Sequence, residues 1–489
     1  MYILGINAYH GDAAAALIKE GRIVAAAEEE RFNRVKHCAG FPAAALRYCL
    51  AEAGISIEDV DHIGISRDPS AHLHKKVLFA AKRLSQIAAP ASRVEFAQAS
   101  VYHRDTENTE DAQKKSETPA SPNQPNGNGR GSGIFRQIKD RLGNAAKVRD
   151  LKDEVARVLD VRQNSIRAQF HNIEHHRAHL ASSFYVSPFE RAALLSIDGF
   201  GDFISTMWAA GEGNAIDVLG QVEYPHSTGI VYTATTQFLG FPHYGDEGKV
   251  MGLAPYGKPR FMNEFREIIR TEERGQFRLD LDYFRHQSEG VDMTWDQGSP
   301  IIGRIFSDAF AQTFGPAREP GAALGDRERD IAASLQQRLE EVGFHILNHL
   351  HEETDLTDLG LSGGVAYNSV MNGKILLNTP FRRVYVQPAA GDSGTALGVC
   401  YEINNGILKR PRGEVMLGAY TGPAFSDDQI RAELEQSKLV FQTYSDEEVT
   451  RHAAQDIADG LVVGWFQGRM EFGPRALGNR SIVVDPRRA

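Results

Sequence analysis

The sequence predicts an α/β protein in which strands and helices alternate and pack in layers. Short apolar runs recur along the chain, glycine-bearing turns follow many of them, and stretches of helical periodicity separate them. We find no repeat at the period of a solenoid. The chain has 489 residues, of which 42% are hydrophobic and 24% charged, so we expect a globular protein of two or three domains.

The first elements are expected to be strands joined by tight turns. Three apolar runs, separated by short polar segments, predict three consecutive strands at residues 2–7, 13–18 and 22–27. The turn after the first strand carries Asn7, Tyr9, His10 and Asp12. Residues 41–54 are then expected to form a helix that ends at a glycine.

A low-complexity segment follows at about residues 97–134. Residues 105–132 contain no Val, Ile, Leu, Phe, Tyr or Trp and are rich in Asn, Gly, Pro, Ser, Glu and Lys. Such a segment buries too little apolar surface to offset the entropy of ordering. We therefore predict a disordered insertion, followed by an amphipathic helix at about residues 150–159.

The rest of the chain continues the alternation. The expected elements are a buried strand at 192–197, a long packed helix at 329–350, a strand and glycine turn at 359–366, a short strand at 384–386, and a helix that opens at 391–394. A loop-rich stretch at 411–423 predicts a boundary between domains at residues 1–410 and 424–489. Apolar residues 461–466 predict a buried strand in the second of these.

Charge and cysteine content argue against a nucleic-acid-binding protein and against a disulfide-rich one. The formal net charge of −10 provides no general basic field, so we expect no nucleic-acid partner. Cys38, Cys49 and Cys400 are too scattered for a disulfide framework and fit a reducing compartment. Neither a signal peptide nor an apolar run of the roughly 20 residues needed to span a bilayer is found, so we expect a cytoplasmic protein without membrane contact.

A cluster of arginines near the end of the sequence predicts an anion site. Residues 468–481 contain Arg469, Arg475 and Arg480 among glycines and a proline. Glycine allows close approach of backbone N–H groups, and the guanidinium fork matches phosphate or carboxylate oxygens. The alternative is a solvated basic loop.

A histidine pair is the candidate metal site. His175 and His179 are expected one helical turn apart, and Asp198, after the next strand, can supply an oxygen ligand. Two imidazoles with carboxylates favour Fe(II), Mn(II) or Zn(II) over Ca(II). His345 and His349 have the same spacing, but they lie along the apolar stripe of the long helix, and we interpret them as packing residues.

Glycine-bearing turns at several strand ends suggest a nucleotide. The turns lie at residues 7–12, 198–202, 362–368 and 391–394, and together they favour a phosphate chain held by backbone N–H groups. Neither the P-loop nor the Rossmann fingerprint is present. The loop at 239–257 combines glycines, aromatic residues and mixed charge, a composition that slightly favours binding of a small polyol over a purely structural loop.

In their order along the chain, these segments resemble the O-carbamoyltransferase family, which includes the nodulation, cephamycin and tobramycin carbamoyltransferases. The matching stretches are residues 4–12, 28–37, 175–179, 246–252, 362–368 and 468–481. They cover almost the whole chain apart from the low-complexity insertion. This colinearity is more specific than any one motif.

The resemblance implies a duplicated fold of the actin/Hsp70/sugar-kinase superfamily for residues 1–410, close to the domain that makes threonylcarbamoyl-adenosine in tRNA. It implies, for residues 424–489, the start of a domain like the one that makes threonylcarbamoyl-adenylate. Because family members continue well beyond the arginine motif, this second domain is expected to be incomplete. In such enzymes, carbamoyl phosphate and ATP give carbamoyl adenylate with release of pyrophosphate. The carbamoyl group then passes to a substrate hydroxyl, and AMP is released.

The resemblance also implies roles for individual residues. His10 is implied as the general base, with Asp12 beside it in the catalytic set. The residues implied to hold Fe(II) or a similar divalent metal are His175, His179, Asp198 and Asp392. The glycines and amide implied at the nucleotide are Gly199, Gly363, Gly364 and Asn368. Arg469, Arg475 and Arg480 are implied to grip carbamoyl phosphate and the phosphates of ATP, which arrives with Mg(II).

Two other interpretations remain open at this point. One is a small-molecule kinase of the same superfamily, and the other is a nucleotide-binding protein that has lost catalysis. The expected partner is a small-molecule hydroxyl acceptor such as a sugar, an antibiotic or another natural product. A homodimer is compatible with this expectation.

Overall fold

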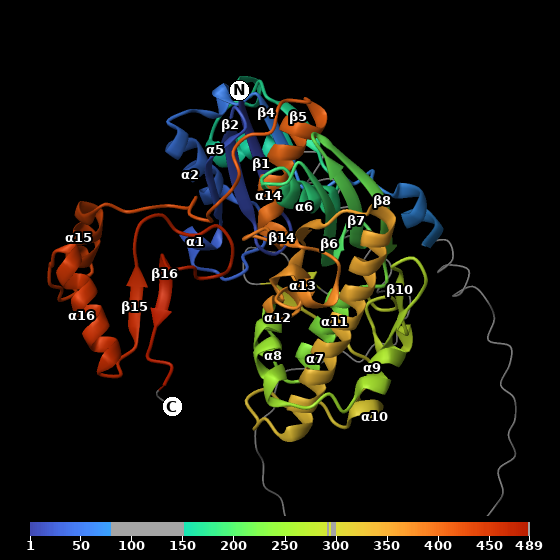
Figure 1. Cartoon of the computed structure of the whole chain (residues 1–489). Helices are drawn as coiled ribbons and strands as arrows, with labels where there is room; N and C mark the ends of the chain where they lie inside the picture. Colours follow the sequence, from blue (N-terminus) through green and yellow to red (C-terminus); the bar gives the residue numbers. More distant parts are fainter. Residues whose placement is uncertain (80–150, 291–292, 295–299, 488–489) are drawn as a thin grey trace, which may run out of the picture.

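The computed structural model describes residues 1–79, 151–290, 293–294 and 300–487, and two five-stranded sheets dominate it (Figure 1). The first sheet has the strand order β3 (Arg22–Glu28), β2 (Ala14–Lys19), β1 (Tyr2–Asn7), β4 (His62–Ile65) and β5 (Gln169–Asn172). The second has the order β14 (Arg383–Val386), β13 (Asp358–Ser362), β6 (Arg191–Gly201), β7 (Ile204–Glu212) and β8 (Ala215–Glu223).

The two sheets share one topology. In each, three consecutive strands pair in antiparallel fashion: β1 to β3 in the first sheet and β6 to β8 in the second. Two later strands then add in parallel beside the first strand of that meander. The same strand order in both sheets confirms the predicted α/β class and the duplicated arrangement of the actin/Hsp70/sugar-kinase superfamily.

Helices separate and cover the sheets. Between the sheets lie α6 (His175–Phe184) and α14 (Asp392–Tyr401), whose apolar side chains share one core with strands of both (Figure 1). The two helices approach closely at Gly398, where a Cβ atom would come within 1.9 Å of the Ala178 carbonyl oxygen. The outer face of the first sheet packs on α2 (Ala43–Ala53) and α5 (Leu151–Leu159), and the second sheet packs on α7 (Thr228–Phe238) and α11 (Asp326–Thr354).

Most of the elements expected from the sequence are present. The helix expected at 41–54 is α2, which ends at Gly54 with a φ of 64°. The helix expected at 329–350 is longer, because α11 begins after Gly325, and the Glu328 carboxylate bonds the Gly325 N–H at the helix start. The helix expected at 150–159 is α5, whereas the predicted disordered insertion lies outside the described residues.

Smaller elements complete the fold. Further α-helices in the described residues include α1 (Glu30–Asn33), α8 (Glu247–Leu253), α9 (Met262–Ile268), α10 (Asp308–Phe314), α12 (Ser369–Asn372) and α13 (Ile375–Asn378). Two short hairpins pair β9 (Ile269–Thr271) with β10 (Phe277–Leu279) and β11 (Met293–Thr294) with β12 (Ile301–Ile302).

The C-terminal region comprises α15 (Asp427–Gln436), α16 (Asp446–Ala458) and a hairpin of β15 (Val463–Phe466) with β16 (Arg480–Val483). The expected strand at 461–466 is present from residue 463, but the expectation that it is buried was wrong. Leu461 and Val462 are 56% and 70% exposed, and neither helix buries a residue. Two strands alone leave both faces of a sheet uncovered, and that is why these apolar side chains stay exposed.

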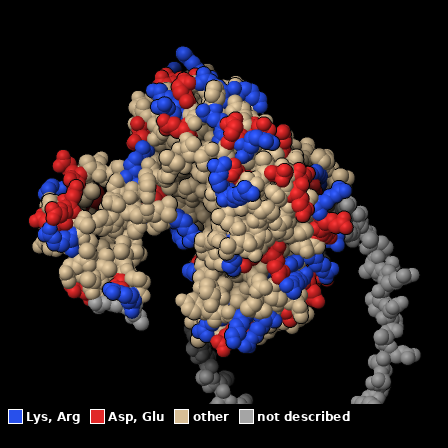
Figure 2. All heavy atoms as spheres, viewed as in Figure 1, with Lys and Arg blue, Asp and Glu red and all other residues tan. Residues whose placement is uncertain are grey.

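The surface carries both signs of charge. On the face shown in Figure 2, Lys and Arg are interspersed with Asp and Glu over the main body, and no extended basic field is visible. Within the described residues, no helix combines the length and the apolar character that crossing a membrane requires.

Candidate active site

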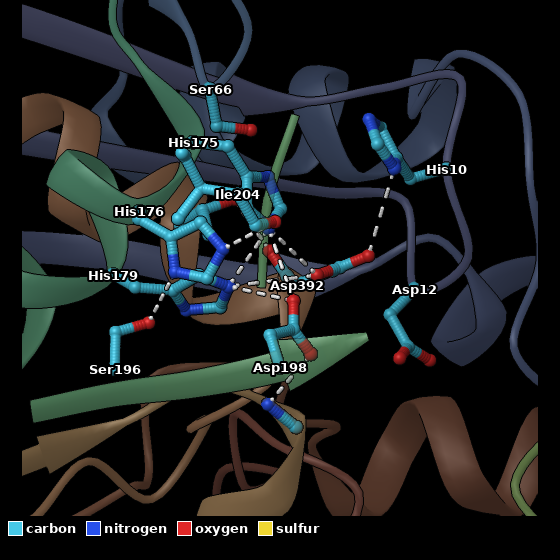
Figure 3. Close-up of polar contacts among 12 residues, drawn as sticks. His10, Asp12, Ser66, His175, His176, His179, Ser196, Asp198, Ile204 and Asp392 are labelled. Atoms are coloured by element: carbon cyan, nitrogen blue, oxygen red, sulfur yellow. Dashed lines mark hydrogen bonds and ion pairs between the residues drawn. The ribbon is translucent and has the colours of Figure 1, made fainter. Parts of the chain in front are cut away.

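Four ligating side chains converge where the two sheets meet the central helices (Figure 3). His175 and His179 lie one turn apart on α6, Asp198 lies near the end of β6, and Asp392 is the first residue of α14. The chain positions all four rigidly, because each comes from a helix or strand and not from a free loop. The structure therefore brings together the four residues that the sequence and the resemblance selected.

Three distances within this cluster match the edges of a coordination polyhedron, and the two to Asp392 are slightly longer. The two histidine Nε2 atoms are 3.1 Å apart, and Asp198 Oδ2 lies 3.1 and 3.3 Å from them. Asp392 Oδ1 lies 3.5 and 3.6 Å from the same nitrogens. A first-row metal with bonds of roughly 2.1 Å holds its ligand atoms about 3.0 to 3.4 Å apart. The donor set fits a divalent ion such as Fe(II), Mn(II) or Zn(II).

The electrostatics of the cluster favour a cation. Burial alone would lower the pKa of His175, but hydrogen bonding to Asp198 and the charge of Asp392 outweigh it and raise that pKa to about 9. The same competition raises the pKa of His179. A site that stabilises positive charge on two buried imidazoles also stabilises a divalent ion between them.

His10 lies at the edge of the cluster. Its ring stacks on that of His175 with the centroids 5.5 Å apart, and its Nδ1 lies 3.8 Å from Asp392 Oδ2. The two oxygens of Asp392 therefore face different partners, one the histidine pair and the other His10 (Figure 3). Burial, followed by the charges of Arg67 and His175, holds the pKa of His10 well below its ordinary value. These surroundings favour the neutral form of the ring.

The neighbouring His176 has a different role. Its Nδ1 lies 2.9 Å from Ser196 Oγ, and its Nε2 lies 3.0 Å from the Ile204 carbonyl oxygen. Both ring nitrogens are thus occupied by strand partners. His176 fixes α6 against the second sheet, while the histidines on either side of it along the chain turn toward the cluster.

Asp12 pairs with a residue to which the sequence assigned no role. His37 Nδ1 lies 2.7 Å from Asp12 Oδ1, and the ring packs edge-on against Tyr244 at 5.2 Å between centroids. Burial alone would lower the pKa of His37, but Asp12 outweighs it and raises that pKa. The backbone also joins the two loops, because the Ala13 N–H donates to the Cys38 carbonyl at 2.9 Å.

The glycine turn after β13 reaches the same centre. The Gly364 N–H donates to Asp198 Oδ1 at 2.9 Å, and Gly363 has a φ of 89° with its Cα against the Ile197 carbonyl. Gly199 follows Asp198 on β6, with open space where its Cβ would be. These backbone groups lie at one sheet edge, as their positions after parallel strands predict.

A hollow of about 600 Å³ is lined by residues of α11 and of α12, the helix that follows this turn. Asn368 and Gln336 exchange two side-chain hydrogen bonds of 2.8 and 2.9 Å, and Gln336 also lines the hollow. Its other walls mix apolar and charged groups: Ala254, Pro255, Phe344, Val370, Glu340 and Lys374. Apolar walls with a few polar groups at the rim are the usual construction of a small-molecule site.

The three arginines of residues 468–481 lie in different surroundings. Arg469 donates to the carbonyl oxygens of Thr421, Gly422 and Val24. Arg480 pairs with Glu471 at 2.7 Å. Arg475 is exposed and donates to the Tyr367 carbonyl at 2.9 Å. In this structure, Arg469 and Arg480 bond to groups of the protein itself. The expectation that all three arginines contact phosphate stays a prediction.

Glu471 organises the arginine segment. Its buried carboxylate accepts from the N–H groups of Leu477, Asn479 and Arg480. Although burial alone would raise the pKa of Glu471, its hydrogen bonds with Arg480 and Leu477 lower it to about 2.

Replacing Glu471 by glutamine is therefore expected to loosen residues 477–480. The loss of one charge-assisted network costs about 2 kcal/mol, which corresponds to roughly thirtyfold faster amide exchange there. Because the folded pKa is depressed, the protection is complete above the ordinary pKa and is lost as the pH falls toward 2. Exchange measured by mass spectrometry checks this. Glu435→Gln on the exposed side of α15 is the control, and equal exchange in both variants would contradict the assigned role.

Comparison with known proteins gives consistent matches. The family described as Carbamoyltransferase N-terminus matches residues 2–401, and that described as Carbamoyltransferase C-terminus matches residues 454–489. Over 99% of its length the chain is 37% identical to an uncharacterized protein of Synechocystis sp. and 32% identical to nodulation protein NolNO of Sinorhizobium fredii. It spans 71% and 59% of those two proteins.

Two further similarities are more limited. Half of the chain is 30% identical to a 3'-hydroxymethylcephem-O-carbamoyltransferase of Streptomyces clavuligerus and covers 40% of that protein. Among solved structures, T. kodakarensis HypF matches 85% of this chain and 50% of its own, with 14% identity and a TM-score of 0.37.

Proposed function

This chain belongs to the carbamoyltransferase family, and from that membership we propose that it transfers a carbamoyl group to a hydroxyl group of a small-molecule acceptor. The observation that carries the proposal is the placement of His10 against the His175–Asp392 side of the ligand cluster. A neutral base beside a cation site is what activation of an alcohol requires, since the pKa of an alcohol lies far above 7. The name of the Streptomyces clavuligerus relative, which specifies a hydroxymethyl group, supports a hydroxyl acceptor.

The proposed donor is carbamoyl adenylate. In the reaction that we propose for the family, it is made from carbamoyl phosphate, ATP and one water molecule, with release of pyrophosphate and inorganic phosphate. We assign transfer to residues 1–410 and place adenylate synthesis in the region from residue 424. Because this chain spans 59% of nodulation protein NolNO, the activity of the longer protein is likewise a proposal.

In the transfer step, His10 takes the proton of the acceptor hydroxyl. The acceptor oxygen forms a bond to the carbamoyl carbon, and the bond from that carbon to the AMP phosphate oxygen breaks. The electron pair of that bond leaves with AMP. The carboxylate of Asp392 near His10 Nδ1 then stabilises the imidazolium that has formed.

Four residues would hold the metal: His175, His179, Asp198 and Asp392. A divalent ion there, Fe(II) or a similar metal, would supply Lewis-acid polarisation of an oxygen on the carbamoyl adenylate. The Gly364 N–H, through its bond to Asp198, keeps one carboxylate oriented toward the histidines.

The hollow beside Gln336 is the proposed adenosine site. Phe344 and Val370 provide apolar surface for a planar base. Glu340 and Lys374, which pair with each other at 2.7 Å, also line the hollow, so a ligand that used either group would compete with that ion pair. From there the glycine turn at 363–364 leads to the cluster, so phosphate groups would lie between the two. Arg475, which is exposed beside Tyr367, is the arginine best placed to reach a phosphate.

Product analysis tests this proposal. The protein, incubated with ATP, Mg(II), carbamoyl phosphate and a panel of hydroxylated natural products, is expected to form AMP, pyrophosphate and a carbamate ester. ADP with a phosphorylated acceptor would instead indicate a kinase of the same superfamily. Binding of ATP without any consumption of carbamoyl phosphate, both by this chain and by a version extended with the remainder of the second domain, would indicate a protein that has lost catalysis.

A further inference from the structure

The segment at residues 470–480 bonds to residues at the end of β3 and in α1. Phe472 is fully buried in the core between the sheets, and its N–H donates to the Ala419 carbonyl at 2.6 Å. Gly473 has a φ of 112°, and a Cβ atom there would come within 2.6 Å of the Pro388 carbonyl oxygen. Close contacts with Ala419 and Pro388 therefore fix the position of this segment.

One buried arginine joins this segment to β3 and α1. Arg31 donates from Nη2 to the Gly473 carbonyl at 2.8 Å, and its Nε lies 3.2 Å from Glu28 Oε2. Its Nη1 pairs with Glu30. The Gly473 N–H closes the ring by donating to Glu28. The Arg31 and Glu28 side chains are only 9% and 3% exposed, so these charges depend on one another for compensation.

The same network continues to the candidate active site. Glu30, held by Arg31 through one oxygen, accepts the His37 N–H through the other at 2.7 Å. His37 in turn bonds Asp12 Oδ1 at 2.7 Å. An unbroken series of charge-assisted contacts therefore runs from Gly473 through Arg31, Glu30 and His37 to Asp12.

The far side of His37 is also constrained. Its Nε2 has no hydrogen-bond partner within the described part of the chain, and it lies beneath Gly245, where a Cβ atom would come within 2.1 Å of it. Tyr244 packs against the ring and against Gly11. The imidazole therefore has one fixed position, which depends on the bonds that its N–H and Nδ1 make.

We infer that Arg31 is a positioning residue, which makes the geometry of the Asp12–His37 pair depend on the docking of residues 470–480. The guanidinium is planar and directs its N–H groups in a rigid fork, so it meets Gly473, Glu28 and Glu30 at once only in one orientation. If the segment moves away, Glu30 loses its fixed partner and releases the His37 backbone. The inference rests on the proposed function, and on Asp12 belonging with His10 to the catalytic set that the family resemblance implies. It adds that the transfer site is competent only with this segment in place.

Hydrogen exchange tests the inference without any need for catalysis. Arg31→Lys keeps the charge but loses the fork, and Gly473→Ala disturbs the segment from the other end through its clash with Pro388. In both variants we expect backbone amides at residues 35–40 to exchange at least tenfold faster. We also expect the pKa of His37, read by exchange of its C2 proton, to fall toward its ordinary value.

The matched control is Arg412→Lys. Arg412 also donates to several carbonyl oxygens, those of Phe184, Ser187 and Phe189, but it makes no contact with Glu28 or Glu30. Unchanged exchange at residues 35–40 in Arg31→Lys and Gly473→Ala would overturn the inference. So would an equal increase in the control. Because neither measurement needs carbamoyl transfer, a negative product assay leaves this test intact.

Discussion

Replacement of His175 and His179 together by alanine is expected to abolish metal binding, from about one equivalent per chain to below about a tenth. Each supplies an Nε2 atom to the cluster, and two carboxylates alone do not retain a borderline metal against buffer and chelator. Elemental analysis of protein purified without added chelator measures the loss. The variant protein is also expected to lose carbamoyl transfer, because without the metal no group would orient and polarise the carbamoyl adenylate.

The chain supplies its own control pair. His345 and His349 have the same spacing on α11, but His345 lies 2.8 Å from the Glu272 carbonyl and His349 pairs with Glu353. Their joint replacement by alanine is expected to leave the metal content unchanged. Equal metal content in wild type and in the His175→Ala/His179→Ala variant would remove these residues from any metal site.

The His10→Gln variant is expected to lose acceptor carbamoylation by about a thousandfold, the size of effect expected for removal of a general base. Glutamine keeps polar character and similar size but takes up no proton. Because His10 faces the acceptor side of Asp392 and not the arginine segment, acceptor-independent consumption of carbamoyl phosphate is expected to persist. Both rates are followed in one assay, as ester formation and as pyrophosphate release.

Two outcomes would contradict the role of His10. Loss of both rates would mean that His10 is needed for adenylate synthesis or for the fold. Retention of both would mean that another group takes the proton, and the Asp12–His37 pair would then be the next candidate. His345→Gln, remote from the cluster on α11, controls for the loss of an imidazole.

Much of this architecture could be read from the sequence. Alternating apolar runs predicted β1 to β3, β6 and β13, because a strand with buried faces needs such a run. The i, i+4 spacing placed His175 and His179 on one helix face. Asp198 could be joined to them because it follows the next strand. Where local patterning alone determines an element, the expectation held.

Other features depend on contacts between distant parts of the chain. His37 gave no signal by spacing, since its partner Asp12 lies on another loop. Only the pairing of β2 with β1 on one side and with β3 on the other brings those loops together. The available signal was that the basic residue His37 follows closely after the acidic residues Glu28 to Glu30 in the sequence. The apolar run at 461–466 was mistaken for a buried strand because composition does not reveal how many strands will cover it.

By itself, the sequence determined the α/β class and the duplicated family fold, since these rest on local periodicity and on colinear motifs. It also selected the histidine pair as a metal site and His10 as a base, and both stay predictions. Only the tertiary structure decided that Asp392 presents one oxygen to the histidines and the other to His10, and that Arg31 links Gly473 to Asp12. It also showed that Arg469 and Arg480 bond to the protein itself. The physical reason is that the orientation of a charged side chain depends on whichever partners the fold brings within hydrogen-bonding distance.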